Sequence, residues 1–155
     1  MKIKVILLGK TADESIRRIE ADYDKRIKRY ISFEYGHIDN AGIKGTEAVI
    51  KQKEGELILK KLAPSDHLIL MDEKGKTYTS VKFADEVARW MNTSIKTVVL
   101  VIGGAYGFSE EVRQRANSSI SLSAMTFSHQ IVRVILLEQI YRAFTILNNE
   151  PYHHA

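Results

Sequence analysis

Two side chains near the end of the chain have the chemistry and spacing of a catalytic pair. His129 and Arg133 are four residues apart in a stretch with helical character, so at about 100° per residue they share one face of a helix. A histidine exchanges a proton near neutral pH, and an arginine stabilises negative charge that develops on a substrate. They are therefore a candidate base and a candidate anion-stabilising cation.

A glycine-rich segment, Gly103-Gly104-Ala105-Tyr106-Gly107, follows the most continuous apolar run of the chain. Glycines let a ligand approach the backbone closely and permit positive φ. The spacing is neither that of a phosphate-binding P-loop nor that of a dinucleotide fingerprint. Ordinary turn chemistry accounts for these glycines as well as a ligand site does, and both interpretations stay open at this point.

Residues 121–129 mix hydroxyl and apolar side chains. The apolar members are Leu122, Ala124, Met125 and Phe127, and the hydroxyl members are Ser121, Ser123, Thr126 and Ser128. We expect the first half to be a strand and the second half a loop with Met125 and Phe127 as an apolar wall. Such a wall, with backbone donors beside it, suits an adenine-sized ligand, although core packing explains the same residues.

The C-terminal segment carries Tyr152, His153 and His154. Taken alone, such a segment is expected to fray. Two histidines can bind a metal, but no third ligand accompanies them, so we predict no metal site.

The chain has no cysteine, which excludes disulfides, thiolate catalysis and cysteine zinc sites and fits a reducing cytoplasm.

Segments with strand and helix character alternate along the chain. The predicted strands are 3–8, 31–38, 67–71, 97–102 and 120–124, and the predicted helices are 11–30, 46–62, 80–91, 109–117 and 128–147. The expected N-caps are Thr11, Thr46, Ser109 and Ser128. This alternation predicts one α/β domain over residues 1–155, with a mostly parallel sheet and flanking helices.

Ligands of such sheets bind at the carboxyl ends of the strands. The useful residues are therefore expected just after Met71, Ile102 and Ala124. A turn over residues 72–76 is expected to follow the third strand, and the strand over 97–102 is expected to be central because it is apolar throughout.

The last helix is apolar almost all the way round from Ile131 to Leu147. A helix without a polar face has to be covered on all sides, so we expect the sheet on one side and a second subunit on the other. Glu138 and Arg142, at i, i+4 spacing, are too costly to bury unpaired and are expected to form a structural ion pair.

The formal net charge is +4 and the isoelectric point is near 9.2. Six basic residues cluster early in the chain: Arg17, Arg18, Lys25, Arg26, Lys28 and Arg29. Acidic residues lie between them, so the cluster is either a solvated helix face or an edge that contacts phosphates.

The apolar runs are too short for a membrane helix or a secretory signal, which predicts a cytoplasmic protein with no membrane partner.

Read together, these motifs closely resemble the ribosomal RNA large subunit methyltransferase H family of the SPOUT superfamily. The matching segments are Lys53-Glu54-Gly55, Val101–Gly104, Leu122–Phe127, His129, Arg133-Val134, Glu138-Gln139, Tyr141–Ala143 and Pro151–His153. Order, spacing and length agree over the whole chain. Two positions depart from the pattern: Ser128 stands where relatives often carry proline, and His154 where they tend to carry arginine or lysine.

The resemblance implies an α/β fold whose C-terminal part forms a trefoil knot. It implies that S-adenosyl-L-methionine (SAM) binds in the knot, at residues that by position are Met71, Gly103, Leu122, Ser123, Ala124, Met125, Thr126 and Phe127. It also implies methylation of N3 of a pseudouridine in 23S rRNA of the assembled ribosome. The second subunit expected on the last helix makes the protein a homodimer.

On this hypothesis His129 and His153 are candidates to take the N3 proton, Arg133 stabilises charge on the base carbonyls, and Tyr152 stacks on the flipped base. The tail of one subunit would complete the pocket of the other. The alternatives are a non-enzymatic RNA- or ribosome-binding protein and a SPOUT methyltransferase acting on tRNA or protein.

Overall fold

The computed structural model of the chain describes residues 1–154. Its five strands form one sheet in the order β2-β1-β4-β3-β5, and every pairing is parallel. The strands are β1 (Lys2–Leu8), β2 (Ser32–Ile38), β3 (His67–Thr77), β4 (Thr97–Ile102) and β5 (Ser118–Ser121). The predicted α/β fold with a mostly parallel sheet is confirmed, and β4 is central as its apolar sequence indicated.

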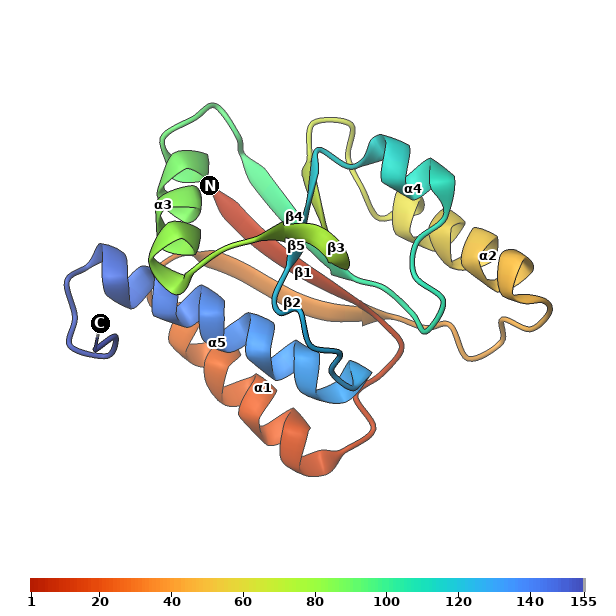
Figure 1. The fold of residues 1–155 in the computed structure, drawn as a ribbon, viewed down its shortest axis with the longest axis horizontal. Helices are drawn as coiled ribbons and strands as arrows, with labels where there is room; N and C mark the ends of the chain where they lie inside the picture. The colour runs from red at the N-terminus through yellow and green to blue at the C-terminus, as the bar shows by residue number, and fades with distance from the viewer. Residues whose placement is uncertain (155) are drawn as a thin grey trace.

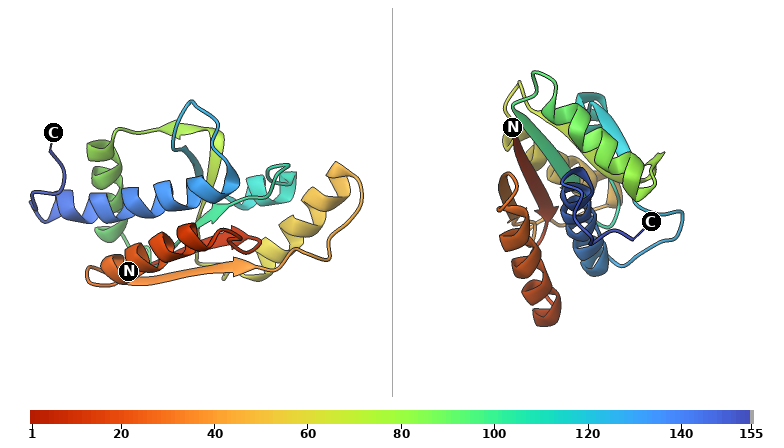
Figure 2. Two further views of the ribbon diagram at one scale, coloured as in Figure 1. Left: turned by 90° about the horizontal axis from the view of Figure 1, so that it is seen from below. Right: turned by 90° about the vertical axis from the view of Figure 1, so that its left-hand side faces the viewer.

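Five helices flank the sheet: α1 (Glu14–Ile27), α2 (Glu47–Lys60), α3 (Ser80–Met91), α4 (Glu110–Arg115) and α5 (His129–Leu147). Helix α5 packs between α1 and α3 on one face of the sheet, and α2 and α4 lie together on the other (Figure 1; Figure 2, right). The core is accordingly divided into two clusters, one around Leu136 and Ile140 of α5 and the other around Ile58 and Val112.

Among the element boundaries that differ from the sequence prediction, two have a clear physical reason. Helix α1 begins after Asp13, whose carboxylate accepts the Ile16 N–H at 3.1 Å, whereas the expected cap Thr11 accepts instead from the Arg133 guanidinium at 2.9 Å. Strand β3 does not end at Met71. It loops out over the predicted turn and pairs with β5 again at Lys76, so both Met71 and Lys76 are in register with Ile120.

Three further predictions of helix starts are confirmed, because Thr46, Ser109 and Ser128 are the N-caps of α2, α4 and α5. Strand β5 is shorter than expected, and residues 122–128 form a loop. Within residues 1–154 no helix is long and apolar enough to cross a membrane. The trefoil knot that the resemblance implies stays a prediction.

Candidate active site

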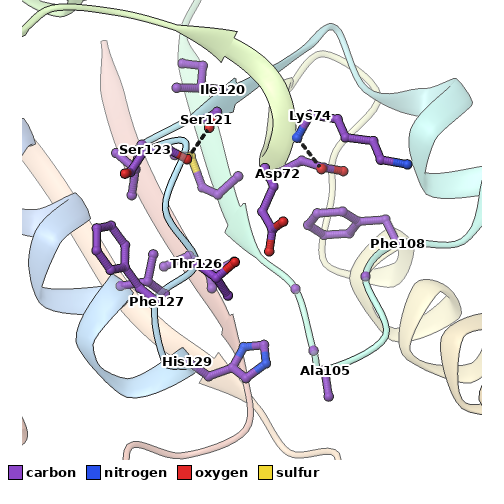
Figure 3. Close-up of a pocket in the computed structure, with 18 of the residues that line it drawn as sticks. Asp72, Lys74, Ala105, Phe108, Ile120, Ser121, Ser123, Thr126, Phe127 and His129 are labelled. Carbon is purple, nitrogen blue, oxygen red and sulfur yellow. Dashed lines mark hydrogen bonds between the residues drawn. The ribbon is translucent and has the colours of Figure 1, made fainter.

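A cavity of about 360 Å³ opens at the carboxyl ends of β4 and β5 and beside Met71, where β3 bulges out of its pairing with β5 (Figure 3). Three loops line it, within residues 71–74, 102–108 and 120–127, and the first turn of α5 closes one side with His129 and Val132. Because the strands are parallel, these loops emerge at one edge of the sheet. The three segments that the sequence placed at strand ends therefore meet around a single space.

Most of the residues predicted to bind the cofactor lie in the wall of this cavity. They are Met71, Gly103, Leu122, Ser123, Met125, Thr126 and Phe127. Ala124 belongs to the same loop but is not one of the lining residues. His129, the first residue of α5, is exposed and projects toward the turn that carries Ala105 (Figure 3).

Hydroxyl groups set the shape of the loop after β5. The Ser121 hydroxyl donates to the Ser123 carbonyl at 2.9 Å, and the Ser123 hydroxyl accepts the Met125 N–H at 2.9 Å. The loop leaves Met125 75% exposed and Phe127 37% exposed. These two side chains are therefore not part of the core packing that was the alternative explanation, and they leave apolar surface at the rim of the cavity, where its burial by a ligand would be favourable.

The glycine-rich turn after β4 excludes side chains at two positions. A Cβ on Gly103 would lie 3.0 Å from the Phe108 ring, and one on Gly104 would lie 2.6 Å from both carboxylate oxygens of Glu54. Glu54 is buried, and its Oε2 accepts from the Asn40 amide at 2.8 Å. The turn is therefore packed on its outer side against α2 and the loop after β2, while its inner side lines the cavity.

Sequence reasoning missed the charged pair on the wall of the cavity. The Asp72 carboxylate is 2.6 Å from the Arg113 guanidinium and accepts the Lys74 N–H at 2.9 Å. Burial by itself would raise the pKa of Asp72, but the Lys74 N–H and the Arg113 charge outweigh it and hold this pKa below its ordinary value. Asp72 is thus an anion at neutral pH, and its place directly after a strand end was the available signal.

Arg133 lies away from the cavity wall. It is buried, and its guanidinium donates to the Thr11 hydroxyl at 2.9 Å and to the Leu8 carbonyl at 3.0 Å. Burial lowers its pKa, an effect that the nearby Tyr35 and Glu20 oppose. These contacts attach the first turns of α5 to the end of β1.

The tail folds back along the C-terminal half of α5. The Tyr152 ring packs edge-on against Tyr141 at 4.8 Å between centroids, and its hydroxyl donates to Glu138 at 3.1 Å. Nδ1 of His153 is 3.1 Å from the Arg142 guanidinium. The predicted Glu138–Arg142 ion pair is confirmed. Tyr152 and His153 are packed rather than frayed, whereas His154 is exposed.

The comparisons agree with this architecture. The family described as "Predicted SPOUT methyltransferase" matches residues 1–153. Ribosomal RNA large subunit methyltransferase H of Flavobacterium johnsoniae is 53% identical over 156 residues, 99% of each chain. The proteins of the same name from Parabacteroides distasonis and Geobacter sulfurreducens are 53% and 46% identical, with 99% of this chain covered. The chain belongs to the ribosomal RNA large subunit methyltransferase H family of SPOUT methyltransferases.

Proposed function

We propose that this protein is a SAM-dependent methyltransferase that methylates N3 of a pseudouridine in 23S rRNA of the assembled ribosome. The observation that carries the proposal is the cavity at the ends of β4 and β5 and beside Met71 of β3, which lies where parallel sheets bind ligands. Its volume of about 360 Å³ falls within the range of roughly 300–1,000 Å³ of small-molecule sites. The names of the relatives support ribosomal RNA as the substrate.

The residues present fit SAM. Leu122, Met125 and Phe127 offer apolar surface for an adenine, and Gly103 lets a ligand reach the backbone of the turn. Asp72 and its partner Arg113 both line the cavity, so the cavity offers one charge of each sign to the ammonium and carboxylate groups of SAM. When bound, SAM supplies the methyl group that is transferred.

His129 is the residue of this chain best placed to act on the substrate. It is exposed at the mouth of the cavity, so a base can reach its imidazole, which would accept the N3 proton. Arg133 contacts the end of β1, and its burial supports a role in positioning α5 and thereby His129.

Tyr152 and His153 act in this proposal on the partner's cavity in a homodimer. The tail contacts Glu138 and Arg142, which lie 9 and 13 residues after His129 on α5, so at about 1.5 Å per residue they are roughly 14 and 20 Å along the helix from the residue that lines the cavity. The tail therefore cannot fill the cavity of its own chain without leaving its docking site. The 41% exposed Ile131 leaves apolar surface on α5 for a second subunit to cover.

Mass spectrometry of 23S rRNA tests the activity and the substrate together. A deletion strain is expected to lack one methylpseudouridine, the gene to restore it, and a His129→Ala gene to restore little of it. An unchanged rRNA profile would refute the substrate, and a methyl group missing from tRNA instead would identify the rival substrate. A protein that binds ribosomes but not SAM in calorimetry would be the non-enzymatic alternative.

A further inference from the structure

A second cavity, of about 410 Å³, lies at the carboxyl ends of β1 and β2, between the sheet and α1. Three basic side chains line it, namely Lys10 after β1, Arg17 on α1 and His37 on β2. The Tyr35 and Glu20 side chains form part of its wall. Nothing in the proposed methyl-transfer site uses these residues.

The basic side chains of this region fall into two groups. Arg18, Arg26 and Lys28 pair with Glu14, Asp22 and Asp24 along α1 and its C-cap. Lys10, Arg17 and His37 are exposed, and none of them forms an ion pair with any of residues 1–154. Half of the early basic cluster, namely Arg18, Arg26 and Lys28, is therefore a solvated helix face whose charges are paired. Arg17, in contrast, lines the second cavity.

The acidic residues in the wall are compensated from within the protein. Glu20 is buried and accepts the Tyr35 hydroxyl through one carboxylate oxygen, while its other oxygen has no hydrogen-bond partner among residues 1–154. Its charge is offset by the nearby Arg133, whose pKa it raises. Asp24 is 2.7 Å from the Lys28 ammonium. The uncompensated charge of the cavity thus belongs to Lys10 and Arg17, which makes the site attractive to an anion.

The register of the sheet fixes how far apart the strand ends beside the two cavities lie. Leu7 of β1 is paired with Ile102 on one side and with His37 on the other. Adjacent strands are about 4.8 Å apart, so the ends of β4 and β2 are separated by roughly 10 Å. An RNA strand that places one base in the first cavity would bring the phosphates next to that base to the same edge of the sheet.

We propose that Lys10 and Arg17, with His37 beside them, bind phosphates of the RNA nucleotides that flank the methylated base. This inference rests on the proposed function, because it takes the substrate to be RNA. The site would hold the backbone in register without reading sequence, as phosphate contacts do. It would also add to the salt dependence of substrate binding, because each phosphate contact releases bound counterions.

The test compares two double variants that lose the same charge. Lys10→Ala/Arg17→Ala removes the proposed phosphate ligands. Lys25→Ala/Arg29→Ala is the control, since both residues are exposed on or just after α1 and line neither cavity. For each protein kcat/KM is measured with ribosomes from a strain lacking the enzyme, over a range of KCl concentrations, and SAM affinity is measured by calorimetry.

The first variant is expected to lose at least 10-fold in kcat/KM at ~0.15 M salt, with a log–log salt slope smaller by about 1.4, or roughly 0.7 for each lost contact to a single strand. Its SAM affinity is expected to equal that of the wild type, and the control to keep the wild-type slope. Equal slopes for the two double variants would overturn the inference. If the wild type transferred no methyl group, the proposed function would fail instead, and cosedimentation with ribosomes would still compare the two variants.

Discussion

At the scale of single residues, Gly104 is constrained by packing on the outer side of its turn. Any side chain there would meet both oxygens of Glu54 at 2.6 Å. The Glu54 carboxylate is buried and held by Asn40, so it has little room to withdraw. The pocket thus depends on a residue of α2 that lines no part of it.

Gly104→Ala is therefore expected to cost about 1–3 kcal/mol of stability through overpacking and to weaken SAM binding by displacing the turn. Calorimetry with SAM and denaturant unfolding measure the two effects. Gly42→Ala is the control, because a Cβ at position 42 has no heavy atom within 4 Å. Unchanged SAM affinity in Gly104→Ala would show that the turn tolerates the displacement.

His67 gives the folded protein a pH dependence of known sign. Burial and the charges of Arg89 and Arg115 lower its pKa, against an opposing effect of Glu86. The unfolded chain, with a histidine pKa of about 6.5, then binds the proton more readily than the folded one. Stability is fully present above that pKa and is lost as the pH falls toward the folded value.

The free energy of unfolding is expected to fall as the pH drops below the unfolded pKa of about 6.5, and to fall less in a His67→Gln variant. Denaturant titrations followed by the fluorescence of Trp90, the single tryptophan, measure this difference. The same pH slope in both proteins would mean that other groups cause the loss.

Strand ends could be located from sequence, and with them most of the cavity wall: Met71, Gly103 and the loop after β5. Contacts between segments distant in the sequence could not be predicted in this way. The Arg113–Asp72 pair joins α4 to the loop within β3, and Glu54 reaches the turn from α2. The local sequence around Arg113 and Glu54 does not indicate which loop each side chain contacts. Arg133 shares a helix with His129, but its long side chain reaches β1 instead of the cavity.

At the scale of elements, local capping chemistry predicted helix starts where nothing distant competed. Thr46, Ser109 and Ser128 cap their helices as their positions indicated. Thr11 does not, because its hydroxyl is taken by Arg133, 122 residues away in sequence. Strand β3 was predicted too short for a related reason, since its second part is held by pairing with β5 and not by its own composition.

Gly75 is what lets β3 return to that pairing after its loop. A Cβ at this position would lie 2.6 Å from the backbone of Ile120, which cannot rotate away as a side chain can. Gly75→Ala is expected to cost about 3 kcal/mol and to weaken SAM binding, because β5 leads into the loop that lines the cavity. Trp90 fluorescence in denaturant measures the first effect.

The matched control is the other glycine in a strand, Gly36 of β2, which faces open space. Gly36→Ala is expected to change stability by no more than about 0.5 kcal/mol. Equal losses in the two variants would mean that β-strand propensity, and not the contact with Ile120, decides the outcome.

At the scale of the whole molecule, the apolar surface of α5 can be covered by other helices of the same chain or by a second subunit, and composition could not separate these two explanations. Part of its surface is covered within the chain by α1 and α3, which pack on either side of it (Figure 1). What remains for a partner is a narrower strip that includes Ile131 at 41% exposure. The same geometry separates the tail from the cavity of its own chain, so dimerisation and a shared site are one hypothesis.

Mixed dimers test that hypothesis. One subunit ends after Glu150 and so lacks the tail, but it keeps the contact of Glu150 with Tyr30; the other carries His129→Ala. Each homodimer is expected to be inactive, whereas dimers isolated through two affinity tags should recover about half the wild-type rate, since one of their two sites is complete. A tail that acted in its own chain would leave both sites of the mixed dimer defective. Recovered activity therefore requires the tail to act on the cavity of the partner. If an intact mixed dimer recovered no activity, Tyr152 and His153 would have a structural role only.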